Sequence, residues 1–522
     1  MSDNLFDQLT RSITDLEAPA IETESGTLSY AALIARTGQI ANALEIGPGD
    51  RVAVQIEKSV DAILLYLATV RAGGVFLPLN TGYTAAEVAY FLGDAAPAVF
   101  VCDPAQLDVL RPVAKAAGAR IETLDTQGGG SLGVAIAAAS AAFDTVARGT
   151  DDLAALLYTS GTTGRSKGAM LSHGNLLSNT RALQDAWRFS ASDVLIHALP
   201  VFHTHGLFVA TNVTLFSGAS MILLPKFDPA RILALMARAT VLMGVPTFYV
   251  RLLDQPGLSR DAVENMRLFV SGSAPLLEET HRSWQERTGH AILERYGMTE
   301  TNMNVSNPYD GDRVAGTVGQ PLPGVEVIVT DPASGAELPQ GEIGMIEVRG
   351  PNVFQGYWQM PEKTAEELRA NGFFITGDLG RYDDRGYLQI VGRGKDLIIS
   401  GGFNVYPKEV EAEIDAIPGV FESAVIGLPH RDLGEAVTAV VVTNARPAPD
   451  EAAILMALHD RLAKFKQPKR VLFVEELPRN TMGKVQKTRC ARRMGICTPV
   501  ERGFSCAGAA PCPGIPAKRL NV

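Results

Sequence analysis

The sequence predicts an α/β fold in which a largely parallel sheet is covered by helices. Between residues 51 and 102, short apolar segments rich in Val, Phe and Leu alternate with segments of helical character. Strands that alternate with helices form parallel sheets, because each helix returns the chain to the same end of the sheet. The chain has 522 residues, which is too long for one hydrophobic core and predicts two or more domains.

The elements of this alternation follow one another closely. In chain order we expect a strand at Arg51–Ile56, a helix at Val60–Ala72, a strand at Val75–Leu79, a helix at Thr84–Leu92 and a strand at Ala98–Cys102. A further buried strand is expected at Leu153–Leu157, a run of Leu and Ala. The Gly-rich segment Thr126–Leu132 is expected to be a surface connection, and no internal repeat is apparent.

The charge balance argues against nonspecific binding of nucleic acid. The chain has 47 Lys and Arg against 57 Asp and Glu, a net charge of −10. Residues 1–7 are acidic and lack the basic and apolar regions of a signal peptide. The longest small-apolar stretch, Val134–Phe143, is too short and too rich in Ala and Ser to cross a bilayer. We therefore expect a cytoplasmic protein that binds neither nucleic acid nor membranes.

The strongest chemical signal is the loop Tyr158–Gly168, with the sequence YTSGTTGRSKG. Its glycines let the backbone turn sharply and bring N–H groups close to an anion. Ser160, Thr162 and Thr163 add hydroxyl donors, and Lys167 adds a positive charge. This chemistry suits a polyphosphate, although the spacing does not fit a Walker A motif.

The loop resembles the phosphate-binding loop of the adenylate-forming superfamily, which includes acyl-CoA synthetases, adenylation domains and luciferases. Ser166 stands where those loops usually have proline. Further segments that resemble the superfamily's signature follow in order, namely Ser271–Pro275, Glu294–Glu300, Thr376–Asp378, Gly392–Asp396 and Pro478–Lys484. The resemblance covers residues 20–487.

The resemblance implies a large N-terminal domain, residues 1–394, of parallel and mixed sheets covered by helices. A small mobile α+β domain would follow over residues 395–487, hinged at Lys395 beside Gly394. Four of the five cysteines lie in the tail, residues 488–522, without the spacing of a zinc site. We expect this tail to be altered sequence that is mostly disordered.

The resemblance also implies a site for ATP and Mg²⁺. Tyr296 would lie against adenine, Asp378 would accept the ribose hydroxyls, and Lys167 would hold the β- and γ-phosphates. Glu300, with Thr162, would hold Mg²⁺, a hard cation that prefers oxygen ligands. The residues expected to bind ATP are Thr159, Ser160, Gly161, Thr162, Thr163, Gly164, Lys167, Ser273, Ala274, Pro275, Glu294, Tyr296, Gly297, Met298, Thr299, Asp378, Arg393 and Lys484.

The implied chemistry is adenylation followed by thioester formation. An acid would attack the α-phosphate, and Lys484 would lower the repulsion between the two anions. Lys167, Glu300 and His205 are the other expected catalytic residues. The segment around Lys484 also resembles sites of reversible lysine acetylation, so an acetyltransferase and a deacetylase are expected partners, and acetylation would remove the charge.

Coenzyme A would then displace AMP. Glycines after a strand leave room for a pantetheine arm, and a basic segment near residue 466 offers contacts for phosphates. The same basic residues could equally be ordinary solvated side chains. The residues expected to contact coenzyme A are Ser400, Gly401, Gly402, Lys464 and Lys466, with Lys469 and Arg470 as further candidates.

The choice of acid is expected to depend on Arg295. Superfamily members that use fatty or aromatic acids usually have glycine at this position, and a guanidinium in an acyl pocket is costly unless it meets an anion. A dicarboxylate supplies that anion, because one carboxylate reacts and the other pairs with the arginine. These features resemble the malonyl-CoA synthetases of the superfamily and imply malonate, or methylmalonate, as the acid. The residues expected to bind it are Arg251, Arg295, Ser273, His205, Thr204 and Met303.

Three alternatives stay open. If Arg295 points away from the pocket, the chain would be an acyl-CoA ligase for another short, fatty or aryl acid. A peptide-synthetase adenylation domain is disfavoured because Phe202–His205 lacks the aspartate that holds an amino group. A nucleotide-binding protein without catalysis is disfavoured by the presence of Glu300, Asp378 and Lys484.

Overall fold

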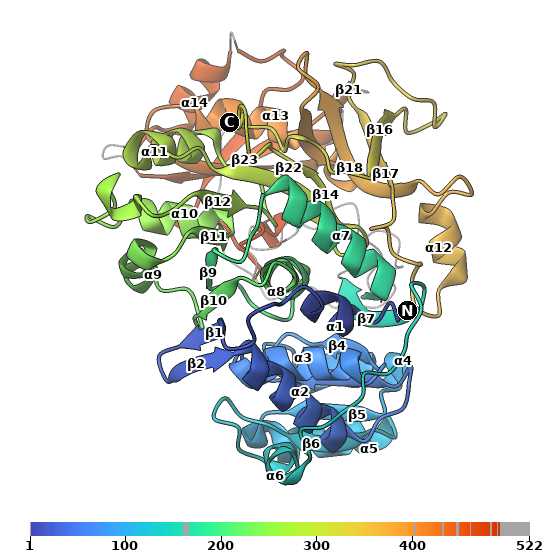
Figure 1. Ribbon diagram of the computed structural model, residues 1–522. Coiled ribbons are helices and arrows are strands. Elements are labelled where there is room, and N and C mark those ends of the chain that lie inside the picture. Colours follow the sequence, from blue (N-terminus) through green and yellow to red (C-terminus); the bar gives the residue numbers. More distant parts are fainter. Residues whose placement is uncertain are drawn as a thin grey trace. The chain divides into compact units, whose positions relative to one another are not determined.

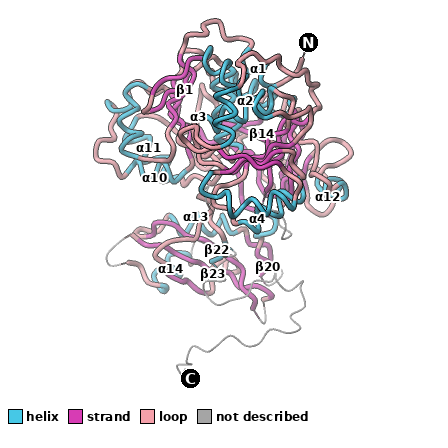
Figure 2. Tube along the Cα trace, turned by 90° about the horizontal axis from the view of Figure 1, so that it is seen from below, coloured by secondary structure: helices cyan, strands magenta, loops and turns pink. Residues whose placement is uncertain are grey.

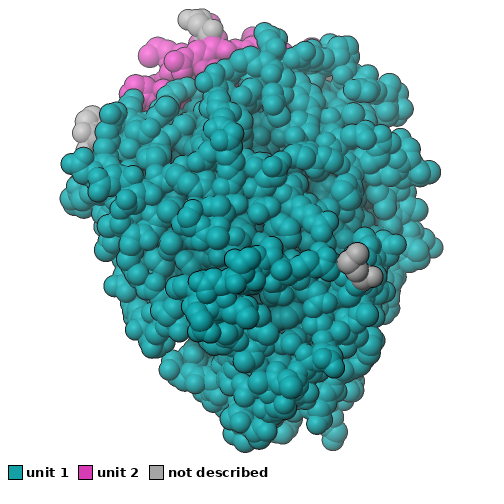
Figure 3. Space-filling model, in the orientation of Figure 1, with its two compact units in different colours: residues 1–390 teal, residues 391–522 magenta. Residues whose placement is uncertain are grey.

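The chain forms two compact units, residues 1–390 and residues 391–522, which Figure 3 shows in different colours. The computed structural model describes residues 2–159, 166–400, 403–430, 433–444, 448–459, 461–480, 483–487 and 489–490. The boundary between the units lies a few residues before Lys395, the predicted hinge. Within the described residues, no helix combines the length and the apolar character needed to cross a membrane.

The first sheet of unit 1 has six strands in the order β6-β5-β3-β4-β7-β8 (Figure 1). The strands are β3 (Arg51–Gln55), β4 (Val75–Pro78), β5 (Val99–Cys102), β6 (Arg120–Thr123), β7 (Leu153–Thr159) and β8 (Lys167–Ser172). Neighbours are parallel except β7 and β8. Residues 52–54 are buried on both faces of the sheet, which explains the unbroken apolar run in the sequence. The predicted parallel, covered sheet is confirmed.

Helices cover both faces of this sheet. They are α2 (Tyr30–Leu44), α3 (Val60–Arg71), α4 (Ala85–Ala95), η1 (Pro104–Gln106), α5 (Leu107–Ala116) and α6 (Ser131–Ala138). Figure 2 shows α2 and α3 on one side of the strands and α4 on the other. Thr84 caps α4, because its hydroxyl accepts the N–H of Glu87, so the helix begins one residue after the predicted start. The predicted connection Thr126–Leu132 ends inside α6, whose apolar residues pack inward after the turn at Gly130.

The second sheet of unit 1 has nine strands in the order β15-β14-β13-β12-β11-β9-β10-β1-β2. They are β1 (Pro19–Thr23), β2 (Gly26–Ser29), β9 (Val194–His197), β10 (Ser220–Leu223), β11 (Val241–Gly244), β12 (Leu268–Ser271), β13 (Leu293–Met298), β14 (Asn302–Ser306) and β15 (Gln320–Pro321). The strands from β1 through β10, β9, β11 and β12 to β13 are parallel, and the three outer pairings are antiparallel.

The helices associated with the nine-stranded sheet include α11, which carries one of the largest buried side chains. They are α1 (Leu5–Thr10), α7 (His173–Ala186), η2 (His205–Thr211, a π-helix), α8 (Asn212–Phe216), α9 (Pro229–Leu235), η3 (Met236–Arg238), α10 (Pro246–Leu253), η4 (Asp261–Val263) and α11 (Glu278–Thr288). Trp284 of α11 is fully buried and contacts the rings of Tyr249 and Phe269 edge to face. These contacts fix α10 and α11 against the sheet.

A four-stranded sheet, β16-β17-β18-β19, completes the mixed architecture predicted for the large domain. Its elements are β16 (Glu326–Thr330), β17 (Gly344–Arg349), α12 (Pro361–Glu367), β18 (Phe374–Tyr382) and β19 (Leu388–Arg393).

Unit 2 is a small α+β unit, as predicted. Its elements are η5 (Gly394–Asp396), β20 (Ile398–Ser400), β21 (Phe403–Val405), α13 (Pro407–Asp415), β22 (Val420–His430), β23 (Gly434–Thr443), α14 (Glu451–Leu458) and β24 (Arg470–Phe473). Val425, Val437 and Val441 of the sheet pack against Ile414 and Ile454 of the helices. The predicted disordered tail lies outside the described residues except for residues 489 and 490.

The start of α7 ties two distant segments of unit 1 together. The Ser172 hydroxyl accepts the Asn175 N–H at 3.1 Å, and the Asn175 side-chain oxygen accepts the Ser172 N–H at 2.9 Å. The Asn175 amide also donates to the carbonyl oxygens of Pro351 and Val353, at 2.9 and 2.8 Å. Asn175 therefore serves both as part of the helix cap and as a link to residues 351–353.

We expect Asn175→Ala to lower the free energy of unfolding more than Ser172→Ala does. The serine variant loses a helix cap, which costs about 1 kcal/mol. The asparagine variant also leaves two carbonyl groups without their donor, for a total of about 2–3 kcal/mol. Urea denaturation of both variants measures the difference, and equal losses would contradict the linking role of Asn175.

Candidate active site

Several of the predicted site residues follow the carboxyl ends of parallel strands in the nine-stranded sheet. Residues 199–205 follow β9, residues 272–275 follow β12, and residues 299–300 follow β13. Because β9, β11, β12 and β13 run parallel, these segments leave the sheet at the same edge. In open α/β sheets this edge is where ligands bind.

Glu300 is a buried carboxylate held by hydroxyl groups. Glu300 is only 5% exposed. Thr159 at the end of β7 donates to Oε1 at 3.3 Å, and the Tyr357 hydroxyl oxygen lies 3.2 Å from the same atom. Burial raises the pKa of Glu300, even though nearby Lys167 and the Tyr357 hydroxyl oppose the increase. Two residues predicted from the sequence, Thr159 and Glu300, are thus in contact.

Lys167, at the start of β8, is also buried and is paired within unit 1. Its Nζ lies 3.1 and 3.2 Å from the two carboxylate oxygens of Glu367, and 4.0 Å from the centroid of the Tyr357 ring. The Tyr357 hydroxyl donates to Glu367 at 2.6 Å. The sequence analysis did not identify Tyr357 or Glu367. Glu367 is one of several glutamates in α12, and nothing in its spacing separates it from its neighbours.

Tyr296 of β13 and Asp378 of β18 are in direct contact. The Tyr296 hydroxyl donates to Oδ2 of Asp378 at 2.7 Å. Asp378 is buried in β18, where its N–H donates to the Thr376 hydroxyl at 3.0 Å and that hydroxyl donates to the Ile346 carbonyl at 2.8 Å. The residues predicted to contact adenine and ribose are therefore neighbours in the structure.

Arg295 is a buried guanidinium whose donors are only partly satisfied. The residue is 3% exposed, and its Nε and Nη2 have no hydrogen-bond partner among the described residues. A Cβ added to Gly272 would lie 2.3 Å from the Arg295 Cζ, so a side chain at position 272 would displace the guanidinium from this position. Burial lowers the pKa of Arg295 to about 9, which leaves it positively charged at neutral pH. A buried cation with free donors favours an anionic ligand.

His205 and Thr204 add further unpartnered polar atoms. His205 Nδ1 lies 3.2 Å from the Ser273 hydroxyl. His205 Nε2 and the Thr204 hydroxyl are buried and make no hydrogen bond to any described residue. Burial and then the charge of Arg295 hold the pKa of His205 well below its usual range, so the ring is neutral at pH 7. The unpartnered atoms of His205 and Thr204 can therefore form hydrogen bonds to a ligand, and they add no charge to that of Arg295.

The turn between β13 and β14 depends on a close backbone approach. A Cβ added to Gly297 would lie 1.9 Å from the Asn302 carbonyl oxygen, so this position requires glycine. Met303 is 2% exposed, and its carbonyl accepts the Asn179 amide at 2.7 Å. Met303 therefore lies in a fixed position, which suits its predicted role in limiting the size of the acid.

Arg251 does not join this group. Its side chain is exposed on α10, and the guanidinium lies 6.0 Å from the ring centroid of Phe227. Phe248, Tyr249 and Leu252 take the inward face of α10, so the helical period directs Arg251 to solvent. The prediction that Arg251 binds the acid has no support in these contacts.

The other residues predicted to bind ATP differ in how they are placed. Glu294 is buried and accepts the Leu276 N–H at 3.2 Å. Ala274 is half-buried, Pro275 is exposed, Met298 ends β13, and Thr299 follows it. Five predicted residues lie outside the described residues, namely Ser160, Gly161, Thr162, Thr163 and Gly164.

Unit 2 carries the remaining predicted residues. Lys484 is exposed in a tight turn, where its N–H donates to the Asn480 side chain at 2.9 Å and its carbonyl accepts the Asn480 N–H at 2.9 Å. Arg393 ends β19, and Lys395 lies in η5. Ser400 is buried at the end of β20.

The predicted coenzyme A residues are only partly described. Gly401 and Gly402 lie outside the described residues. Lys464 is exposed, whereas Lys466 pairs with Glu409 at 2.5 Å. Lys466 therefore already has an anionic partner within unit 2, and Lys464 has the more accessible side chain.

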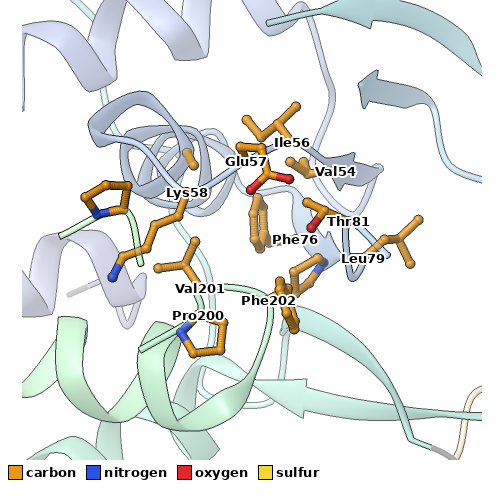
Figure 4. Close-up of a pocket in the computed structure, with 13 residues that line it drawn as sticks. Val54, Ile56, Glu57, Lys58, Phe76, Leu79, Thr81, Pro200, Val201 and Phe202 are labelled. Atoms are coloured by element: carbon orange, nitrogen blue, oxygen red, sulfur yellow. The ribbon is translucent and has the colours of Figure 1, made fainter. Parts of the chain in front are cut away.

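A cavity of about 90 Å³ lies next to the predicted acid-binding segment (Figure 4). Lys58 lines it, and its Nζ donates to the His197 carbonyl at 2.8 Å and lies 3.0 Å from His197 Nδ1. His197 Nε2 lies 2.9 Å from the Gly206 carbonyl in η2. Arg295 does not line this cavity. Lys58 and His197, both missed from the sequence, instead hold the segment that carries His205.

Two family models match most of the chain. The model of the AMP-binding enzyme family matches residues 12–358, and that of the AMP-binding enzyme C-terminal domain matches residues 409–484. Among curated proteins, a malonate–CoA ligase of Arabidopsis thaliana is 35% identical over 473 residues, covering 84% of this chain and 77% of that protein. A feruloyl-CoA synthase of an Amycolatopsis species is 36% identical over 486 residues, covering 92% of this chain and 96% of that protein.

A solved structure is more similar still. The crystal structure of ATP-bound MatB from Rhodopseudomonas palustris is 64% identical in sequence, with a TM-score of 0.93. The match covers 94% of this chain and 99% of that one.

We expect Arg295→Met to raise the thermal stability of the ligand-free protein. A buried cation without full hydrogen bonding opposes folding at any pH below its lowered pKa of about 9. An apolar side chain of similar length removes that cost, a gain of about 1–3 kcal/mol. Differential scanning calorimetry at pH 7.5 measures the change. Arg251→Met is the matched control, because Arg251 is exposed and its loss is expected to change stability by less than about 0.5 kcal/mol.

Proposed function

The chain belongs to the AMP-binding enzyme family, and we propose that it joins malonate to coenzyme A at the expense of ATP. The reaction would pass through malonyl-AMP and release pyrophosphate and then AMP. This proposal uses both units, since the two family models together match segments from residue 12 to residue 484.

The proposal that malonate is the acid depends on the buried guanidinium of Arg295. Family membership alone does not fix the acid, because the similar proteins include both a malonate–CoA ligase and a feruloyl-CoA synthase. The unpartnered donors of Arg295, with His205 Nε2 and the Thr204 hydroxyl, suit a small acid that keeps one carboxylate free. A malonate carboxylate in this group would supply the missing hydrogen-bond acceptors. Methylmalonate has the same two carboxylates and is a second candidate substrate.

Lys167, Glu300 and Asp378 would hold the nucleotide. The Lys167 ammonium suits the β- and γ-phosphates, and the Asp378 carboxylate suits the ribose hydroxyls. Glu300 fits Mg²⁺, because Mg²⁺ in nucleotide sites is held by one or two carboxylates together with phosphate oxygens. Among the described residues, no group of three or more His, Cys, Asp or Glu side chains gathers to hold a metal by itself. When bound, the ion would neutralise charge on the phosphates.

The proposed chemistry needs two displacements. A carboxylate oxygen of malonate attacks the α-phosphorus, the new O–P bond forms, and the bond to pyrophosphate breaks. The sulfur of coenzyme A, after its thiol proton is lost to water, then attacks the acyl carbon, the thioester bond forms, and AMP leaves with the electron pair of the broken C–O bond. Neutral His205 donates or accepts a hydrogen bond near the acid, and its low pKa keeps it from adding charge there.

Lys484 is proposed to stabilise charge on the α-phosphate during the first step. Its exposure in a tight turn also makes it accessible to a lysine acetyltransferase and a deacetylase, which is part of the same proposal. Acetylation would remove the charge that the first step needs. Rotation of residues 395–487 about Lys395 and a cytoplasmic location stay predictions from the sequence.

Pyrophosphate release with a panel of acids tests the proposed substrate. With ATP, Mg²⁺ and coenzyme A, we expect kcat/KM for malonate to exceed that for acetate, butyrate and ferulate by on the order of 100-fold or more. In Arg295→Met, malonate activity should fall by about 100-fold or more, because the free carboxylate loses its charged partner. Arg251→Met should keep malonate activity. Equal use of butyrate and malonate by the wild type would contradict the proposal.

Glu300→Gln should abolish most adenylation, since the amide keeps the shape but loses the charge that suits Mg²⁺. Burial raises the pKa of Glu300 above its ordinary value of 4.5, so the carboxylate takes up a proton as the pH falls through that raised pKa. We therefore expect the acidic limb of the kcat/KM profile to lie above pH 4.5. Pyrophosphate release measured across pH 4.5–8 would reveal it, and full activity at pH 4.5 would contradict the assignment of Glu300.

A further inference from the structure

Lys167 already has an anionic partner within its own unit. Both carboxylate oxygens of Glu367 lie near its ammonium, at 3.1 and 3.2 Å, and the Tyr357 ring lies under it at 4.0 Å. The lysine is 6% exposed, so its ammonium is largely withdrawn from water, whereas the Glu367 side chain is partly exposed. Opposite charges at this distance attract strongly when solvent does not screen them.

Glu367 is held in place by more than the lysine. The Tyr357 hydroxyl donates to its Oε2 at 2.6 Å, and Lys363, one turn earlier in α12, lies 3.0 Å from its Oε1. Burial opposes ionisation, but hydrogen bonds from Tyr357, Lys363 and Lys167 together hold the pKa of Glu367 below its ordinary value. The carboxylate is therefore charged at neutral pH and would keep two partners if Lys167 left it.

We propose that Glu367 is an internal competitor of the nucleotide phosphates for Lys167. A β- or γ-phosphate that binds the ammonium has to share or replace the carboxylate, and the two anions repel each other at such short range. When pyrophosphate leaves, the carboxylate takes the ammonium back. Glu367 would thus weaken the binding of ATP and assist the release of pyrophosphate, while Lys363 and Tyr357 hold the carboxylate during the exchange.

This inference rests on the proposed role of Lys167 in holding the phosphates that leave as pyrophosphate. A competing role for Glu367 differs from a purely positioning role, because the two roles predict opposite changes in the affinity for ATP. A carboxylate that orients the lysine for ATP would strengthen nucleotide binding, whereas a competitor weakens it. Removal of the charge distinguishes them.

Calorimetric titration of the full chain with Mg-ATP, pyrophosphate and AMP tests the inference. In Glu367→Gln we expect ATP and pyrophosphate to bind at least about fivefold more tightly, which is the low end of ordinary coupling between ligands that share a group. The affinity for AMP, which has no β- or γ-phosphate, should stay within about twofold of the wild type. Inhibition of the forward reaction by added pyrophosphate should become stronger in the same proportion.

Glu366→Gln is the matched control. Glu366 is next to Glu367 in α12, its side chain is exposed, and it pairs with Lys363 at 2.7 Å. The control should bind all three ligands as the wild type does. Thermal denaturation of both variants shows whether each is folded. Unchanged or weaker binding of ATP in a folded Glu367→Gln variant would overturn the inference, and failure of the wild type to bind ATP would overturn the proposed function together with it.

Discussion

The parallel pairing of β9, β11, β12 and β13 is the constraint on which the site depends. Each strand ends at the same edge of the sheet, and the chain beyond each end carries different chemistry. Residues far apart in sequence, such as His205, Ser273 and Arg295, are brought together by this arrangement alone. The positions where side chains would obstruct it, Gly272 and Gly297, are glycines because the backbone passes too close to a neighbour.

Two buried cations of unit 1, Lys167 and Arg295, differ in whether their charge is balanced by a partner in the protein. Lys167 is neutralised by Glu367 and lies over an aromatic ring, so its charge is satisfied before any ligand arrives. Arg295 lacks hydrogen-bond partners for two of its nitrogens among the described residues and packs on a glycine instead. The protein therefore bears an electrostatic cost where the acid is proposed to bind, and avoids one where the phosphates are proposed to bind. Under that proposal, selectivity would follow from the unsatisfied charge, since an acid without a second carboxylate would leave it unpaired.

Much of the fold and part of the site could be predicted from the sequence. The strand and helix alternation of residues 51–102 has strong local signals, and the Thr84 cap fixed a helix start to within one residue. Arg295 was predicted to bind the acid because an arginine stands where the family usually has glycine, and its role stays a prediction. The exposed position of Arg251 could not be predicted in the same way, since its orientation depends on the packing of α10.

One physical reason explains why four residues near the site were not predicted from the sequence. Tyr357, Glu367, Lys58 and His197 act through contacts with residues far away in the chain, so no local pattern marks them. Glu367 pairs across 200 residues with Lys167, and Lys58 pairs across 139 residues with His197. Such partners become visible only when the tertiary structure places them side by side.

The contact between Gly272 and Arg295 also limits how this site can evolve. A side chain at position 272 would overlap the guanidinium, so the arginine would have to leave its present position. A smaller residue at position 295 would free the space above Gly272. Substitutions at the two positions are therefore expected to be coupled, and a larger residue 272 is accommodated more easily once the arginine has been replaced.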